Sequence, residues 1–151
     1  LNYYVRTGKL LNPRKGFYTK LNYDPVELAC IIYTPSYISL EYVLQKSGII
    51  FQYDSRITLV SYLSRSIEVT GTAYLFRKIK ADILLNTEGI IRQDNCVNVA
   101  SAERAFLDLL YLNTEYYFDN LNPLDKHVIQ KLLTIYQSKT LYDKVKKLLS
   151  Q

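Results

Sequence analysis

Residues 56–80, RITLVSYLSRSIEVTGTAYLFRKIK, decide the fold class of this chain. Valine, isoleucine, threonine and aromatic residues are frequent in this stretch and follow the period of two that is typical of β-strands. We predict strands at 56–64, 66–70 and 73–80, with Gly71-Thr72 as the tight connection between the last two. Three consecutive strands of this kind predict a meander, in which each strand pairs with the next one along the chain.

Basic residues fall on both faces of the third strand. Arg77 lies on one face, and Lys78 and Lys80 lie on the other, so neither face is purely apolar. We therefore expect one side of the sheet to be partly solvated or to face a ligand. Two more short strands are predicted at about 90–92 and 96–99, each next to a polar turn.

Helical patterns lie on both sides of the strands. Asp24 is suited to cap a helix that begins with Pro25 and cannot continue past Pro35. Ser39 is predicted to cap a second helix at about 40–47.

After the strands, apolar residues recur at spacings of three and four, which predicts three more helices. One opens at Ser101, and the others lie within 121–137 and 139–151. The fold class is therefore α+β, with a hairpin followed by a mostly antiparallel sheet that packs with about five helices.

The start of the chain is strongly basic. Residues 8–20, GKLLNPRKGFYTK, have the pattern of a hairpin, with strands in KLL and FYT and a turn in NPRKG. The preceding LNYYVRT fits the last turns of a helix that Gly8 ends. Residues 1–20 contain no acidic residue and five basic ones: Arg6, Lys9, Arg14, Lys15 and Lys20. Such a cluster favours binding to polyanions, and the alternative is an ordinary basic surface in contact with solvent.

Composition limits the class of protein. The chain has 151 residues, 48% hydrophobic and 22% charged, which suits one domain, alone or with a fragment of a second. Because it contains no methionine, even at position 1, we expect its natural start to lie upstream. No apolar run has the length of a membrane span and no signal peptide is recognisable, so we expect a cytoplasmic protein without a membrane partner. Cys30 and Cys96 belong to no metal or redox motif and are predicted to be free thiols.

The sequence has no pattern typical of a catalytic or metal site. His127 is the only histidine, and its neighbours favour an ordinary surface position early in a helix. The acidic residues that could serve in acid–base catalysis show no motif spacing: Glu68, Asp82, Glu88, Asp94, Glu103 and Asp108. The five glycines form no phosphate-binding loop. We therefore predict no enzymatic activity, no metal and no cofactor.

Arg104 and Asp108 lie one turn apart in the helix predicted after Ser101, close enough to form an ion pair. One interpretation is a structural pair beside the sheet, and the other is that Arg104 organises a polar pocket against the strands. The fifteen tyrosines leave a similar choice. They could stack on bases or line an interface, although most tyrosines lie at the edge of a core.

Four segments of the chain occur together in a characteristic order. They are YYVRTGKLLNPRKGFYT, DPVELACIIYTPSYISLEYVLQKSGII, the strands that end in FRKIK, and ASAERAFLDLLYL followed by YYFDNL. In this order they resemble the AbiEi-like antitoxin family of type IV toxin–antitoxin systems over nearly the whole chain. The most specific parts are the hairpin, the YISLEYVL helix and ASAERAFLDLL, in which Ala102 stands where proline is common in the family.

The resemblance implies two domains. Residues 1–22 would be the wing and the last helical turns of a winged helix-turn-helix domain truncated at its start, and 23–151 the antitoxin domain. Full-length members bind operator DNA as repressors of their own operon and counter a nucleotidyltransferase-like toxin in phage abortive infection. The five basic residues of 1–20 are the predicted contacts to the DNA backbone. A possible effector surface on the second domain consists of Arg65, Arg77, Lys78, Lys80 and Arg104.

Two other functions stay open. The chain could be a winged-helix regulator whose α+β domain senses a small ligand or oligomerises, with no toxin partner. It could also be an enzyme of the nuclease or nucleotidyltransferase type, which the missing carboxylate and histidine patterns disfavour. The sequence does not indicate the operator, the oligomeric state or how a toxin would be countered.

Overall fold

The computed structural model describes residues 10–14, 17–20, 24–113 and 115–150 of the chain. The described residues form an α+β fold, as predicted, with six α-helices, a two-stranded sheet and a six-stranded sheet. The predicted helical turns before Gly8 lie outside these residues.

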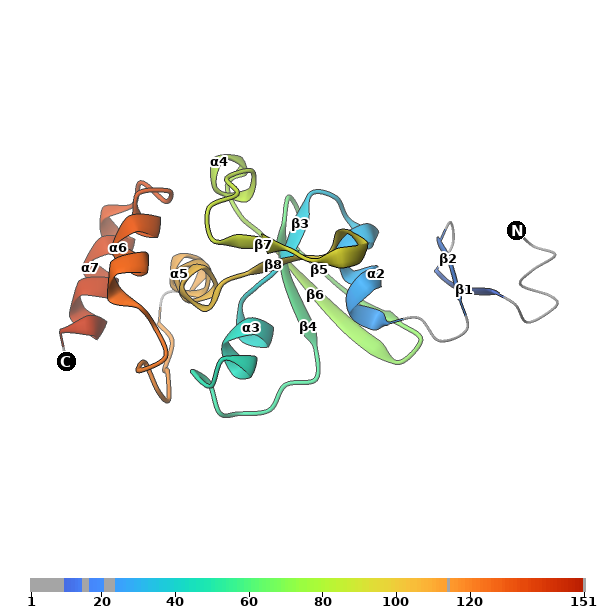
Figure 1. Ribbon diagram of the computed structural model, residues 1–151, viewed down its shortest axis with the longest axis horizontal. Helices are drawn as coiled ribbons and strands as arrows, with labels where there is room; N and C mark the ends of the chain where they lie inside the picture. The colour runs from blue at the N-terminus through green and yellow to red at the C-terminus, as the bar shows by residue number, and fades with distance from the viewer. Residues whose placement is uncertain (1–9, 15–16, 21–23, 114, 151) are drawn as a thin grey trace.

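The basic hairpin forms the smaller sheet. Strand β1 (Leu10–Arg14) pairs antiparallel with β2 (Phe17–Lys20), and neither strand joins the larger sheet. Both strands are visible next to the N-terminus in Figure 1. The prediction of a hairpin at 8–20 is therefore confirmed for the part of it that the structure describes.

The predicted strands of residues 56–80 are all present, as β4 (Ile57–Ser61), β5 (Arg65–Val69) and β6 (Thr72–Lys78). The predicted meander is wrong, because β6 lies between the other two strands, antiparallel to β5 and parallel to β4. Burial explains this order. All five residues of β4 are buried, whereas β5 buries only Val69, so β4 takes an interior position and β5 forms an edge.

A central strand occurs between Pro35 and the second predicted helix, where the sequence predicts no strand. Strand β3 (Ser36–Ile38) is antiparallel to β4 and parallel to β8 (Asn98–Ala100), and all three of its residues are buried. Strand β7 (Ile90–Arg92) pairs with β8 and forms the second edge. The strand order is β5-β6-β4-β3-β8-β7, with two parallel and three antiparallel pairs, so the sheet is mixed rather than mostly antiparallel.

Helices cover both faces of the six-stranded sheet (Figure 1). Helix α2 (Pro25–Ile32) lies on one face, and α3 (Glu41–Lys46) and α5 (Ala102–Leu112) lie on the other. Residues 104–110 of α5 are all buried, which makes α5 the most enclosed of the described helices. Helix α5 is therefore the element around which the second half of the fold is organised.

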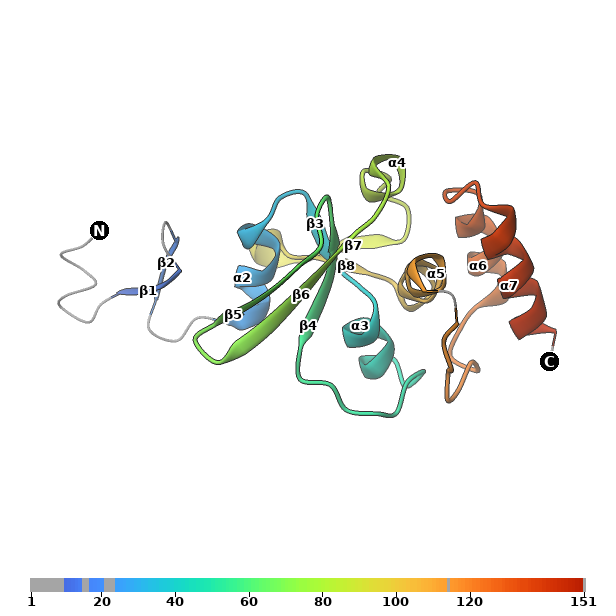
Figure 2. The same ribbon diagram turned by 180° about the vertical axis from the view of Figure 1, so that it is seen from behind.

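Two further helices, α6 (Lys126–Leu133) and α7 (Lys139–Leu149), pack against α5 and form an additional layer, which Figure 2 shows from behind. The five predicted helices are thus present. Helix α4 (Ala81–Leu84) is not predicted, because four residues are too few to show a helical period. Each helix of the described ranges is too short or too polar to cross a lipid bilayer.

Helix caps follow the sequence with one exception. The side chains of Asp24 and Ser101 accept hydrogen bonds from the first turns of α2 and α5, as predicted. Ser39 does not cap α3, because Leu40 occupies the N-cap position with a φ of 65° and Ser39 is buried. The Ser39 hydroxyl is instead bound to Asp108 of α5. Ser39 therefore forms a tertiary hydrogen bond to α5 instead of the predicted cap of α3.

Candidate functional site

The structure places two of the five predicted DNA contacts in the hairpin. Arg14 ends β1 and is paired with Phe17 next to the turn, whereas Lys20 ends β2 and is paired with Leu10 at the far end of the hairpin. Arg6, Lys9 and Lys15 lie outside the described residues. The two placed residues thus mark both ends of the hairpin.

The predicted effector surface does not form one patch. Arg65 is paired with Phe76 and therefore shares its face of the sheet, together with Lys78 two residues further along. Arg77 points to the opposite face, where it reaches α5. Lys80 is exposed in the segment after β6, at the start of α4. These basic residues are thus divided between two faces of the sheet.

Arg77 and a residue outside the prediction, Lys144 of α7, meet at the C-terminal end of α5. Arg77 donates hydrogen bonds to the carbonyl of Leu112 and to the side chain of Asn113. The Lys144 ammonium donates to the carbonyls of Leu110 and Asn113, at 3.1 and 2.9 Å. Cations at the carbonyl end of a helix favour its dipole, so both residues stabilise α5.

Arg104 is fully buried, so it cannot belong to a surface. Its guanidinium donates to the carbonyl oxygens of Ile83 at 2.7 Å and of Asn86 at 2.8 Å, and also to that of Glu88. A fourth hydrogen bond, of 3.2 Å, joins it to the hydroxyl of Tyr37. Arg104 therefore ties the segment 83–88, which runs from the end of α4 toward β7, to α5 and to β3.

Asp108 is the acidic partner of this cluster and is also fully buried. Its carboxylate accepts hydrogen bonds from Tyr37, Ser39 and Tyr136, at 2.9, 2.8 and 2.6 Å. The nearest atoms of Asp108 and Arg104, Oδ1 and Nε, are 3.9 Å apart. The predicted ion pair is present, but the hydroxyl groups, rather than the guanidinium, are in direct contact with the carboxylate.

Burial governs the acid–base behaviour of the cluster. It raises the pKa of Asp108, against the opposing effect of Arg104 and of the three hydroxyl donors. Burial also raises the pKa of Tyr37 and of Tyr136 well above its usual value, and the negative charge of Asp108 acts in the same direction. Both phenols therefore stay protonated and remain hydrogen-bond donors at neutral pH.

The sequence identified Arg104 and Asp108 but not Tyr37, Ser39 and Tyr136. The sequence of α5 does indicate that Asp108 is buried, because in AFLDLL it has apolar neighbours on both sides. A charged pair inside a helix that is apolar all round points to the interior of the protein. The hydroxyl partners come from β3, from the residue after it and from the turn between α6 and α7, and no local spacing connects these elements.

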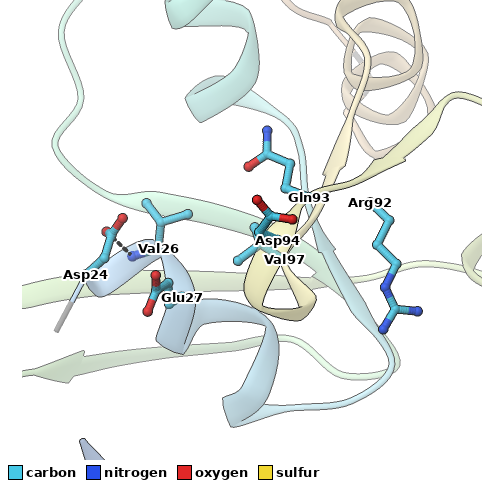
Figure 3. Close-up of a pocket in the computed structure, with 7 residues that line it drawn as sticks. All are labelled: Asp24, Val26, Glu27, Arg92, Gln93, Asp94 and Val97. Atoms are coloured by element: carbon cyan, nitrogen blue, oxygen red, sulfur yellow. Dashed lines mark hydrogen bonds between the residues drawn. The ribbon is translucent and has the colours of Figure 1, made fainter. Parts of the chain in front are cut away.

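A pocket of about 510 Å³ lies between the start of α2 and the 3₁₀ turn η1 (Asp94–Cys96), as Figure 3 shows. Three carboxylates line it, those of Asp24, Glu27 and Asp94. Asp24 is engaged as the cap of α2, with Oδ1 2.9 Å from the amide of Val26. Within the described ranges, no three histidine, cysteine or acidic side chains are arranged to hold a metal ion. The pocket therefore offers no recognisable chemistry.

The remaining candidate residues are His127 and the two cysteines, and Cys96 lies in η1 rather than in the strand predicted at about 96–99. His127 is exposed in the first turn of α6. Cys30 is buried and Cys96 is exposed, and both are free thiols. Burial raises the pKa of the Cys30 thiol.

A comparison of the chain with protein-family models and with curated proteins finds no match.

Proposed function

We propose that this chain is an antitoxin of the AbiEi-like type, which counters a nucleotidyltransferase-like toxin and whose basic hairpin contacts DNA. The observation that carries the proposal is the separation of the β1–β2 hairpin from the six-stranded sheet. Residues 1–20 carry five basic residues and no acidic one. This arrangement is the one that the family resemblance implies for a wing followed by an antitoxin domain.

The distribution of charge supports a division of roles. Residues 24–119, which form the six-stranded sheet and helices α2 to α5, contain eight basic and twelve acidic residues, so this part of the protein has an excess of negative charge. Exposed charges act over about 10 Å at 0.1 M salt. A polyanion is therefore attracted to the hairpin and repelled by residues 24–119, so phosphate contacts should lie on the hairpin rather than on the six-stranded sheet and helices α2 to α5.

The C-terminal helices are the better place for an effector surface on the second domain. Residues 125–151 contain six basic and two acidic residues. Of these, Lys144 is engaged at the end of α5, whereas Lys131, Lys146 and Lys147 are exposed. These three lysines lie on α6 and α7, and we assign the effector surface to them rather than to the divided basic residues of β5 and β6.

Co-expression with a nucleotidyltransferase-like toxin taken from a reading frame beside the gene tests the proposal. The chain should restore growth, and the variant Arg14→Ala/Lys15→Ala/Lys20→Ala should restore it equally well. The same variant should lose DNA affinity. The slope of log K for DNA binding against log salt concentration should become less steep by about 3, since each of the three lost phosphate contacts contributes about 0.9. Failure of the unmodified chain to restore growth would refute the antitoxin role.

A reciprocal variant separates the two roles. Lys131→Ala/Lys146→Ala/Lys147→Ala should leave DNA affinity unchanged and should impair the rescue of growth. If the hairpin variant and this variant impair the same activity, the division between hairpin and body is wrong. Circular dichroism of both proteins checks that their folds are intact.

One observation favours a second candidate function, a winged-helix regulator whose α+β domain senses a ligand. The sheet carries a small pocket beside Tyr37, with an arginine at its rim. A regulator of this kind needs no toxin. Absence of a nucleotidyltransferase-like reading frame beside the gene would favour it over the antitoxin.

A further inference from the structure

A second pocket, of about 300 Å³, lies where the sheet is incomplete. Strands β3 and β8 pair at a single position, Ile38 with Val99, so the preceding residues Tyr37 and Asn98 are not paired with each other. The pocket opens beside them and is bounded on its other side by Leu84, Thr87 and Ile90, from α4 to the start of β7. It therefore lies between the sheet and the segment that follows α4.

Both walls of this pocket are fixed by the buried cluster. Arg104 holds the carbonyls of Ile83, Asn86 and Glu88, which belong to the α4–β7 wall. The opposite wall includes Tyr37, whose hydroxyl is bound to Arg104 and Asp108. A pocket with walls held in this way is formed before a ligand arrives, which lowers the entropic cost of binding.

The lining combines apolar side chains with one cation, Arg92, whose guanidinium donates a hydrogen bond to the Cys96 sulfur at 3.6 Å. Leu84, Ile90 and the ring of Tyr37 supply apolar surface. Arg92 is exposed at the rim and is the cross-strand partner of Asn98, so both side chains lie on the same face. Among the described residues, no carboxylate lies within ion-pair distance of Arg92, and Figure 3 shows its guanidinium directed away from Asp94.

The geometry points to a binding site for a small organic carboxylate with a compact apolar body. The carboxylate binds the Arg92 guanidinium and the Asn98 amide, and the body packs against Leu84, Ile90 and Tyr37. The pocket volume is at the lower end of the range of about 300–1,000 Å³ for small-molecule sites, which suits a single ring or a short alkyl chain. This inference does not depend on whether the protein is an antitoxin.

Titration of the ¹⁵N-labelled chain with benzoate, followed by amide chemical shifts, tests the site. We expect saturable shifts at Tyr37, Asn98 and the α4–β7 segment. Acetate, which lacks the apolar body, and benzamide, which lacks the charge, should each bind at least about tenfold more weakly. Equal affinity for benzoate and either of these two probes would overturn the assigned ligand class.

Variants of the two exposed arginines at opposite edges of the sheet complete the test. Arg92→Gln should weaken benzoate binding by at least about tenfold, and Arg92→Lys should retain part of the affinity. Arg65→Gln is the matched control, since Arg65 lies on β5 at the other edge, and it should bind benzoate like the unmodified chain. Unsaturable shifts, shifts scattered over the surface, or an Arg92→Gln protein that binds normally would refute the site.

Discussion

Replacement of Arg104 by methionine should strongly destabilise the fold. Methionine fills much of the same volume but provides no hydrogen-bond donor. Three backbone carbonyls and the Tyr37 hydroxyl lose a partner in this variant, and the Asp108 carboxylate loses the cation beside it. The segment 83–88 should therefore detach from α5 before the rest of the protein unfolds.

The magnitude follows from burial. Arg104 and Asp108 are both inaccessible to solvent, and removal of one partner from a buried charged pair costs about 3–5 kcal/mol. Three hydroxyl donors still solvate Asp108 in the variant, which favours the lower half of that range. Since domains of this size are stable by about 5–15 kcal/mol, the variant should remain folded but become marginal.

Urea unfolding followed by circular dichroism measures this loss, with Arg65→Met as the matched control. Arg65 is an exposed arginine whose guanidinium donates one exposed hydrogen bond to the Tyr33 hydroxyl, so its replacement should change the free energy of unfolding by no more than about 1 kcal/mol. Hydrogen exchange should show faster exchange at amides of residues 84–90 in Arg104→Met than in the control. A loss below about 1 kcal/mol in Arg104→Met, or unchanged exchange in this segment, would refute the role assigned to Arg104.

Three more predictions concern single positions. Gly48 and Gly89 both have a φ of 76°, but of these two only Gly89 would place a Cβ 3.2 Å from side chains of α5 and α6. In urea unfolding, Gly48→Ala should lower the free energy of unfolding by about 1–2 kcal/mol. Gly89→Ala should lower it by about 1–3 kcal/mol more. A thiol reagent should label exposed Cys96 rapidly and buried Cys30 only on unfolding, and Cys96→Ser should abolish the rapid phase. Removal of the α5 cap by Ser101→Ala should lower the free energy of unfolding by about 1 kcal/mol.

The sequence predicts the elements of this fold well where they are long and periodic. Strands β4 to β6 and helices α5, α6 and α7 repeat their apolar residues often enough to show a period, whereas α2 is marked by its capping residue and the prolines at its ends. Strand β3 has only three residues and follows a proline, so its local pattern is that of a turn. Its place at the centre of the sheet depends on β4 and β8, which are distant in sequence.

Strand order and the buried cluster depend on contacts between residues far apart in the sequence, which local sequence patterns do not predict. The insertion of β6 between β4 and β5 follows from the difference in burial between those two strands, which becomes visible only when the helices are in place. Ser39 satisfies the rule for a helix cap, but its hydroxyl forms a buried hydrogen bond to Asp108 instead. The sequence leaves open whether Arg104 forms a structural pair or organises a polar pocket. Its full burial beside Asp108 favours the structural pair.

Two charges are buried at this place because of the backbone that surrounds them. The carbonyls of Asn86 and Glu88 lie in the connection between α4 and β7, which no strand pairs with, so they need donors from a side chain. The carbonyl of Ile83, at the end of α4, accepts from the amide of Asn86 and also from Arg104. Arginine is the side chain whose fixed fork of donors can serve several acceptors at once. A buried guanidinium in turn requires a negative charge nearby, and a buried carboxylate requires donors, which Tyr37, Ser39 and Tyr136 supply. The cluster is therefore a consequence of holding one connection against the sheet, and that connection is the wall of the pocket beside Tyr37.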